Sequence, residues 1–387
     1  MLKTLKNNRW ILLLVLFFVG IRIFGLDQFY HQDEYRWVQQ VYVEKFGEVD
    51  SPHPPVMQSL FSLGGKLFGY DNLRIVPFFF GVLNLLLIFA ISFKLTSNKK
   101  LAYLASGLYL INVYSLIANL MIDIDGTLMP FLVLLAFYFY LKVFKDSDKK
   151  FILPLILALL VGLLTKLSFV LFVVALVAEY LWVLYDGGKF RYQLKRTAFF
   201  LGLFGISIIL LYILYGKADP RFLEYSTSFK YFNFASRAYF DLGLRLFKFF
   251  IWLSPLLCLP MIYGLFKKEI FTKFRVWYLY ALFNFLFYLV IFDFARLPIE
   301  RYFMFIIIPS VLISAYVIYP FFGKLNKKYL ILSSVAFLVL LVWTAVAVYE
   351  VVPLNPKEAY VDKVKDFNFN FLIPLTGGSG PIFFYGS

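Results

Sequence analysis

The feature that most constrains this chain is a series of long apolar stretches with almost no charged residues. A helix needs about 20 apolar residues to cross the hydrocarbon core of a membrane. Hydrophobic residues make up 61% of the 387 positions and charged residues only 16%, whereas a soluble protein is about 45–50% apolar and about 25% charged. We therefore predict an all-α, polytopic membrane protein with about eleven spans, at 10–26, 73–94, 100–119, 127–144, 151–168, 169–185, 197–215, 244–266, 275–293, 302–321 and 329–350.

Short basic clusters lie in every second connection between these spans. Cytoplasmic loops carry an excess of Lys and Arg, so the clusters predict a cytoplasmic N-terminus, and the net charge of +15 reflects topology rather than nucleic-acid binding. Residues 1–350 would form the transmembrane body, with a first extracytoplasmic loop at 27–72, and residues 351–387 a short extracytoplasmic tail. The clusters lie at 3–9, 99–100, 145–150, 189–196, 267–275 and 324–328.

The first outer loop carries the strongest chemical signal. The acidic pair Asp33 and Glu34 follows the first span, residues 35–46 have the pattern of an amphipathic surface helix, and His53 stands before two prolines. Proline stiffens the turn and would fix the imidazole near the interface. A carboxylate held near the bilayer can act as a general base when its position and pKa suit proton abstraction. The alternative is a solvated acidic loop with a proline-rich turn.

Further polar residues are expected on the same side of the membrane. Asp123 and Asp125 are two residues apart, so on a helix they diverge by about 200° and only one would face a site; Asp123 could instead cap the next helix. Lys166 ends a span, where it could bind phosphate or extend to the interface as a lipid-facing lysine does. Arg22 and Glu179 lie within spans and need partners; Asp33 is a candidate for Arg22, and none can be named for Glu179.

Several motifs, in the same order and on the same predicted side, resemble the GT-C glycosyltransferases. The resemblance covers about residues 10–320 and is strongest to the protein O-mannosyltransferases and the aminoarabinose and related lipid-sugar transferases. The motifs are the acidic pair 33–34 with the His-Pro-Pro turn at 53–55, Arg74 to Pro77 opening a span, Asp125 to Leu128, the glycine-to-lysine stretch 162–166, and Arg301-Tyr302 with Pro309.

This resemblance implies a sugar transferase that uses a polyprenyl-phosphate carrier and an acceptor outside the cytoplasm. Asp33 would be the catalytic base for an inverting displacement, with Glu34 beside it, and Asp125 would be an accessory acid, with Asp123 its neighbour. Fixed cations would stabilise the negative charge that the leaving phosphate gains. The candidates for binding the donor phosphate are His53, Lys166, Arg301 and Arg74.

Cofactors, acceptor and mechanism stay less defined. The turn has Pro52 and His53 where the aminoarabinose branch has glutamate and lysine, so no cofactor is certain; a divalent metal held by His31, Asp33, Glu34 and His53 stays open. The acceptor could be a lipid, a glycan or a protein, and membrane lipid is a partner, whereas nucleic acid is not. The alternative function is a transporter or flippase of a polar lipid or anion, which would place ionisable groups near the midplane, often in repeated halves. A structural scaffold would leave the clustered outer carboxylates unexplained.

Overall fold

The structure is a computed structural model that describes residues 9–26, 38, 41, 55–187, 202, 205, 206, 209, 213, 255–287, 304–322, 331 and 335. Within these residues every regular element is helical, so the predicted all-α class is confirmed for them. The longer elements are α2 (Arg9–Arg22), α4 (Pro55–Phe68), α5 (Ile75–Thr96), α6 (Lys99–Ile111), α7 (Val113–Ala118), α8 (Met129–Tyr140), α9 (Ile152–Thr165), α10 (Val170–Asp186), α14 (Pro255–Leu265), α15 (Lys268–Phe285) and α16 (Met304–Phe322).

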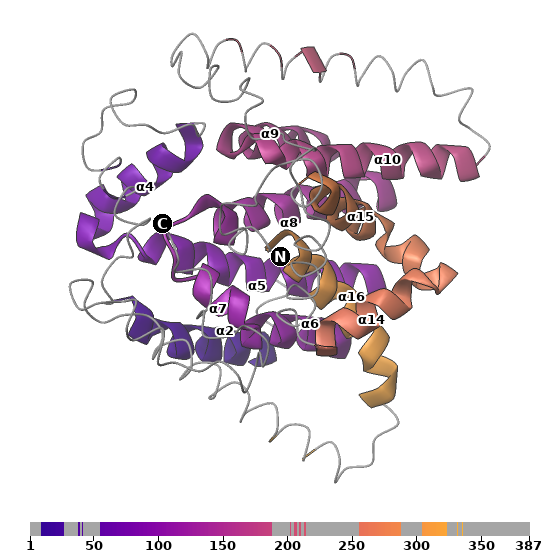
Figure 1. Ribbon diagram of the computed structural model, residues 1–387, viewed down its shortest axis with the longest axis horizontal. Helices are drawn as coiled ribbons and strands as arrows, with labels where there is room; N and C mark the ends of the chain where they lie inside the picture. Colours follow the sequence, from indigo (N-terminus) through magenta and orange to yellow (C-terminus); the bar gives the residue numbers. More distant parts are fainter. Residues whose placement is uncertain are drawn as a thin grey trace, which may run out of the picture.

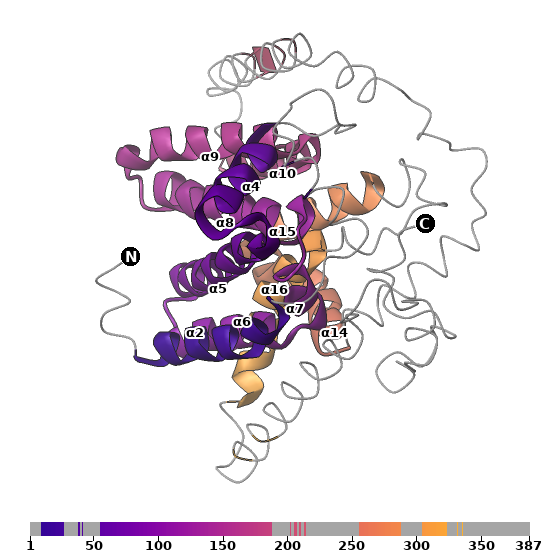
Figure 2. The same ribbon diagram turned by 90° about the vertical axis from the view of Figure 1, so that its left-hand side faces the viewer.

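The helices pack as a bundle in which chain neighbours run side by side (Figure 1). α5 packs against α6 and α8, and α8 packs against α9. α16 packs against α6, α14 and α15, and α15 packs against α10. Figure 2, turned by 90°, shows α9 and α10 at one side of this bundle and α2 and α6 at the other. The start of α5 and the start of α8 therefore lie at one end of the bundle, because α6 and α7 bring the chain back between them.

Within the part of the chain that the structure describes, three helical stretches are long and apolar enough to cross a membrane, namely Tyr70–Thr96, Ile124–Lys145 and Met304–Phe321. They correspond to the predicted spans 73–94, 127–144 and 302–321. The other predicted spans between residues 10 and 185, together with 244–266 and 275–293, each contain a described helix. Most of 197–215 and of 329–350, the predicted surface helix 35–46 and the tail 351–387 lie outside the described residues.

The hairpin between α5 and α6 shows how the sequence ends one helix and begins the next. Ser97 has a φ of 55° and its backbone N–H donates to the carbonyl of Phe93, which closes α5 with a left-handed residue. The Asn98 side chain accepts hydrogen bonds from the backbone N–H groups of Lys100 and Leu101 and thereby caps α6. This turn fixes the two helices as antiparallel neighbours.

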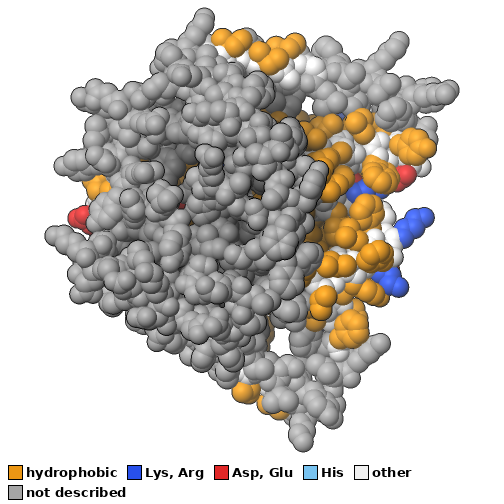
Figure 3. Space-filling model, in the orientation of Figure 1, with side chains coloured by type: hydrophobic (Ala, Val, Ile, Leu, Met, Phe, Trp, Pro, Cys, Tyr) orange, Lys and Arg blue, Asp and Glu red, His pale blue; other side chains and the backbone are white. Residues whose placement is uncertain are grey.

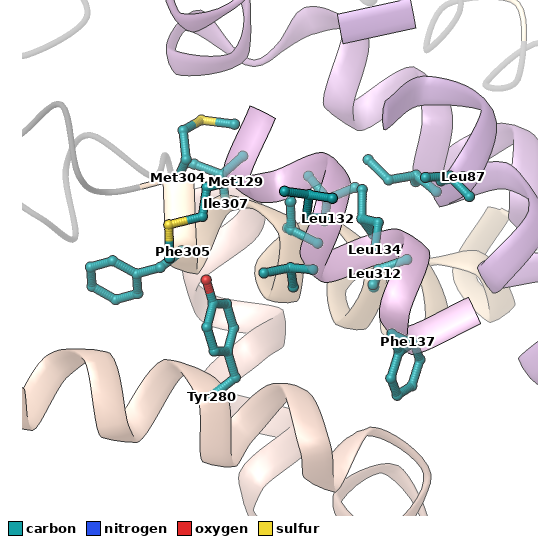
Figure 4. Packing of buried hydrophobic residues seen from close by; sticks show 14 of the residues in the cluster. Leu87, Met129, Leu132, Leu134, Phe137, Tyr280, Met304, Phe305, Ile307 and Leu312 are labelled. Atoms are coloured by element: carbon teal, nitrogen blue, oxygen red, sulfur yellow. The ribbon is translucent and has the colours of Figure 1, made fainter. Parts of the chain in front are cut away.

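The interior of the bundle is filled by aliphatic and aromatic side chains. Figure 4 shows residues of α8, α15 and α16 meeting in this core, among them Leu132, Phe137, Tyr280 and Ile307. Large apolar side chains also cover the outside, for example Trp10 and Leu153, and Figure 3 shows a band of hydrophobic side chains on the visible face. An apolar exterior over an apolar core is the pattern of a helix bundle in lipid; the chain is a membrane protein.

Three local features differ from the sequence-based expectation. Residues 55–68 form α4 inside the predicted outer loop 27–72, with a proline at the first helical position. The predicted span 100–119 is broken at Asn112, whose backbone is extended, so α6 and the short α7 are separate helices. α15 begins at Lys268 rather than near 275 and has a non-helical residue at Phe274, where the helix bends.

The partner of Glu179, which the sequence alone left open, is Arg275. The guanidinium of Arg275 donates to Glu179 through Nε at 2.5 Å and through Nη2 at 3.2 Å, and also contacts Asp186 at 3.4 Å. It lies 4.7 Å from the ring centroid of Trp182. Arg275 is therefore a buried residue that ties α15 to α10, and not a solvated member of the basic cluster 267–275.

Candidate functional site

Asp125 and Lys166 form an ion pair at one end of the bundle. Lys166 Nζ lies 2.5 Å from Asp125 Oδ2, and the two side chains are only 12% and 8% exposed. A charge pair with so little access to water interacts more strongly than a surface pair, and the loss of one partner would leave a buried charge uncompensated. The structure thus brings together two candidates that are 41 residues apart in sequence.

Asp125 lies in a π-helical turn, Ile124–Leu128, directly before α8. Asp123 precedes this turn in an extended conformation, and its carboxylate accepts from the backbone N–H groups of Ile124 at 2.6 Å and of Asp125 at 3.4 Å. The capping role predicted for Asp123 is therefore confirmed. π-Helical turns occur often at functional sites because they redirect a side chain.

Helices α5 and α7 both contact the π-helical turn that carries Asp125. Asn84, buried in α5, donates from Nδ2 to the carbonyl of Thr127 at 3.0 Å. A Cβ at Gly126 would lie 2.9 Å from the carbonyl oxygen of Ala118 in α7, closer than such atoms pack. Glycine is thus needed for α7 to approach the turn, and Asp125 is fixed by contacts on two sides.

Lys166 is positioned by the turn between α9 and α10. Its backbone is extended, its N–H donates to the carbonyl of Gly162 at 3.1 Å, and its own carbonyl accepts from Phe169 at 3.0 Å. The Phe169 ring folds back onto α9, where a Cβ at Gly162 would come within 2.6 Å of three ring atoms. The glycine-to-lysine spacing therefore has a structural reason: Gly162 makes room for the ring that closes the turn.

Arg74 lies at the same end of the bundle, at the start of α5. Its guanidinium is buried and donates from Nη1 to the carbonyl of Gly25, three residues after the end of α2 and near the end of the first span, at 3.1 Å. Because Asn84 donates to Thr127, Asn84 lies at the height of the Asp125 turn along the bundle axis. Ten residues of helix separate Arg74 from Asn84. At 1.5 Å per residue, Arg74 lies about 15 Å along the bundle from that level. Its described contact stabilises the exit from the first span.

Arg22, at the end of α2, is fully buried. Its Nη2 donates to the carbonyl of Leu110 at 3.3 Å and to Oγ of Ser115 at 3.4 Å, and its guanidinium lies 3.8 Å from the centroid of the Phe18 ring. These contacts link α2 to the region where α6 gives way to α7. A pairing of Arg22 with Asp33 involves a residue outside the described part and stays a prediction.

Four of the candidate residues lie outside the described residues, so their positions relative to the ion pair stay predictions. They are Asp33, Glu34, His53 and Arg301. Among the residues that the structure describes, no three His, Cys, Asp or Glu side chains gather in a way that could hold a metal ion. The metal candidates His31, Asp33, Glu34 and His53 are not among those residues.

Asn84 is the residue at this site that sequence reasoning missed. The available signal was a lone amide within a long apolar span, because an amide in lipid must find a hydrogen-bond partner. Arg22 and Glu179 carry the same signal, a polar side chain within a span.

Comparison with known proteins gives one family match and similarity to solved structures at the level of the fold. Residues 52–215, less than half of the chain, match the family of dolichyl-phosphate-mannose-protein mannosyltransferases. The crystal structure of ArnT from Cupriavidus metallidurans in the apo state matches with a TM-score of 0.58 and 16% identity, over 89% of this chain and 64% of that one. The chain has a GT-C fold. The structure of the same ArnT bound to undecaprenyl phosphate matches with a TM-score of 0.58 and 17% identity, over 95% of this chain and 67% of that one.

The predicted resemblance to the GT-C superfamily is thereby confirmed at the level of the fold. The chain spans about two thirds of the length of the ArnT structures. A search of curated proteins finds no match to the sequence.

Proposed function

We propose that this protein is a membrane glycosyltransferase that moves a sugar from a polyprenyl-phosphate carrier to an acceptor outside the cytoplasm. The observation that carries the proposal is the buried ion pair of Asp125 and Lys166, set at one end of a bundle with a GT-C fold. The ArnT structure with undecaprenyl phosphate supports a lipid-phosphate donor for proteins of this fold. The basic clusters of the other connections support an extracytoplasmic position for the ion pair.

Lys166 is the proposed donor-phosphate ligand that lies in the described ion pair. A lysine ammonium acts as a point charge with three donors, and Asp125 fixes its position at 2.5 Å. A cation that is already in place costs no reorganisation when negative charge develops during reaction. His53 and Arg301 are proposed as further phosphate ligands. Arg74 is assigned to the same group from the resemblance, in addition to its contact with Gly25.

Asp33 is the proposed catalytic base, with Glu34 beside it. Its carboxylate takes the proton from the acceptor hydroxyl, and the acceptor oxygen bonds to the anomeric carbon as the bond from that carbon to the phosphate oxygen breaks. The configuration of the sugar inverts, and the polyprenyl phosphate leaves with one additional negative charge. The fixed cations stabilise that charge, and the bond made balances the bond broken. The acceptor class, whether lipid, glycan or protein, stays open in this proposal.

A transfer assay with a matched control tests the proposal. Purified protein receives polyprenyl-phosphate sugars and a membrane extract, and the release of polyprenyl phosphate is followed. Asp33→Asn should slow transfer by about 10²–10⁴-fold, the usual range for a lost general base. Asp71→Asn makes the same chemical change at an exposed position of the first outer loop and should transfer at the wild-type rate.

Two results would overturn the proposal. Equal transfer rates for wild type and Asp33→Asn would remove Asp33 as the base. Movement of intact labelled donor across a vesicle membrane, without release of polyprenyl phosphate, would identify a transporter or flippase instead.

A further inference from the structure

A cavity of about 430 Å³ lies between α5 and α8, at the end of these helices that is remote from Asp125. Asp125 stands at the start of the helical stretch that ends at Lys145. Twenty residues of helix separate the two, which corresponds to about 30 Å. The cavity is therefore spatially separate from the candidate active site, and the proposed sugar transfer does not account for it.

One part of the cavity wall is charged. Lys94, Lys142 and Lys145 line it together with Asp146, so three positive charges face one negative charge. Asp146 accepts from Lys94 and lies 3.2 Å from Lys142 Nζ, while Lys145 Nζ donates to the backbone carbonyl of Lys94 at 3.1 Å. These contacts gather three ammonium groups around one opening and leave an excess of positive charge there.

The other part of the wall is apolar and follows α5 toward the middle of the bundle. Leu86, Phe89, Ala90 and Phe93 line it, all within about two helical turns of Lys94. Tyr138 of α8 lies opposite and also lies 5.9 Å from Lys142 Nζ, measured to the ring centroid. A cluster of ammonium groups at the helix ends, continued by an apolar wall along the helices, matches a phosphate headgroup followed by an acyl chain.

We infer that this cavity binds one anionic phospholipid, with the phosphate at Lys142 and Lys145 and an acyl chain along Phe89 and Ala90. Basic pockets between transmembrane helices on the cytoplasmic side bind anionic headgroups in this way. The basic clusters 99–100 and 145–150 place this end of α5 and α8 on the cytoplasmic side, where anionic lipids concentrate. Inorganic phosphate would match the lysines and leave the apolar wall unused, so the lipid is the better fit.

Native mass spectrometry of the purified full-length protein tests the inference. The protein is titrated with dioleoyl-phosphatidylglycerol and, in parallel, with dioleoyl-phosphatidylcholine, which has the same chains and no net charge. We expect one tightly bound phosphatidylglycerol per protein and no equivalent phosphatidylcholine. A K142A/K145A variant should bind that lipid roughly 30-fold more weakly, since a basic residue near the surface contributes about 1 kcal/mol.

Two further variants separate the cavity from general surface charge. A K149A/K150A variant removes the same charge from exposed lysines of the same connection that do not line the cavity, and it should keep the bound lipid. An A90W variant keeps every lysine and fills the apolar part of the cavity, and it should lose the lipid. A thermal unfolding transition shows whether each variant is folded. If the K142A/K145A variant does not fold, the A90W variant still tests the inference, because it keeps all the lysines.

Three results would overturn the inference. Equal losses in the K142A/K145A and K149A/K150A variants would indicate attraction by surface charge alone. Retention of phosphatidylglycerol by A90W would show that the chain does not enter the cavity. Displacement of the lipid by millimolar inorganic phosphate would identify a phosphate site rather than a lipid site.

Discussion

A methyl group added at Gly162 would test how the turn before Lys166 is built. In a Gly162→Ala variant the new Cβ would come within 2.6 Å of three atoms of the Phe169 ring. The ring cannot move away easily, because Phe169 is fully buried and packs edge-on against Phe172 with 5.7 Å between centroids. We therefore expect the ring, and the turn that it closes, to shift.

Two opposing effects set the size of the change. Overpacking of a tight core costs about 1–3 kcal/mol. Replacing glycine by alanine within a helix, here α9, gains about 0.5–1 kcal/mol. Contacts within 2.6 Å of a fully buried ring correspond to the upper half of that cost, about 2–3 kcal/mol, so Gly162→Ala should lower the free energy of unfolding by about 1–2 kcal/mol. Because the turn carries Lys166, the ion pair with Asp125 should weaken and sugar transfer should fall as well.

The assay is unfolding of purified protein in mixed micelles, with Gly20→Ala as the matched control. Gly20 is also helical, in α2, and a Cβ there meets nothing within 4 Å, so its alanine variant should be as stable as wild type or slightly more stable. A Gly162→Ala/Phe169→Leu double variant should be less destabilised than the sum of its single changes, because the clashing ring is gone. Equal effects of the two glycine substitutions would refute the packing argument.

The remaining predictions concern two charge clusters. Glu179→Leu should destabilise the protein by about 3–5 kcal/mol, because it leaves Arg275 as a buried charge whose remaining contact is Asp186 at 3.4 Å. The double variant Glu179→Leu/Arg275→Met should cost less than either single change, because neither charge is then left unpaired. A double variant that is less stable than both single variants in thermal unfolding would contradict this. A hydrogen bond from Lys94 holds the pKa of Asp146 below its ordinary value of 3.8, so the stabilisation by Asp146 is present above pH 4 and lost as the pH falls through the depressed pKa. Asp146→Asn should therefore be less stable than wild type by under about 1 kcal/mol at pH 7, because the side chain is partly exposed. In an acid melting series this difference should begin to shrink as the pH falls below 3.8 and should vanish below the depressed pKa of Asp146. A difference that does not shrink with falling pH would show that the ion pair is not its source.

The sequence predicted best those helices that must be apolar both toward lipid and toward the core of the bundle. Apolar runs of about 20 residues predicted the helices α5, α8 and α16 because crossing a membrane leaves little choice of length. Boundaries were harder. The break at Asn112 depends on one extended residue within an apolar run. α15 begins seven residues before the predicted span and includes Arg275, whose buried partner Glu179 lies on another helix and could not be assigned from the sequence.

The candidate site was predictable in its residue types and not in its pairing. Spacing separated Asp123 from Asp125 and suggested the cap, and the glycine-to-lysine stretch singled out Lys166. The contact between Asp125 and Lys166 arises from the π-helical turn and from the Phe169 ring against Gly162. Each of these features is local, but Asp125 and Lys166 are 41 residues apart, so no local pattern encodes their contact. The roles of Asp33, Glu34, His53 and Arg301 stay predictions.

Binding of a polyprenyl phosphate to the Lys166 variant tests the central claim most directly. Lys166→Met removes the proposed phosphate ligand, and a charge-assisted hydrogen bond contributes about 1.5–3 kcal/mol, so affinity should fall roughly 10- to 150-fold. Lys149→Met makes the same change at an exposed lysine toward the other end of the bundle and should bind as wild type does. A folded Lys166→Met protein that binds polyprenyl phosphate with wild-type affinity would contradict the account.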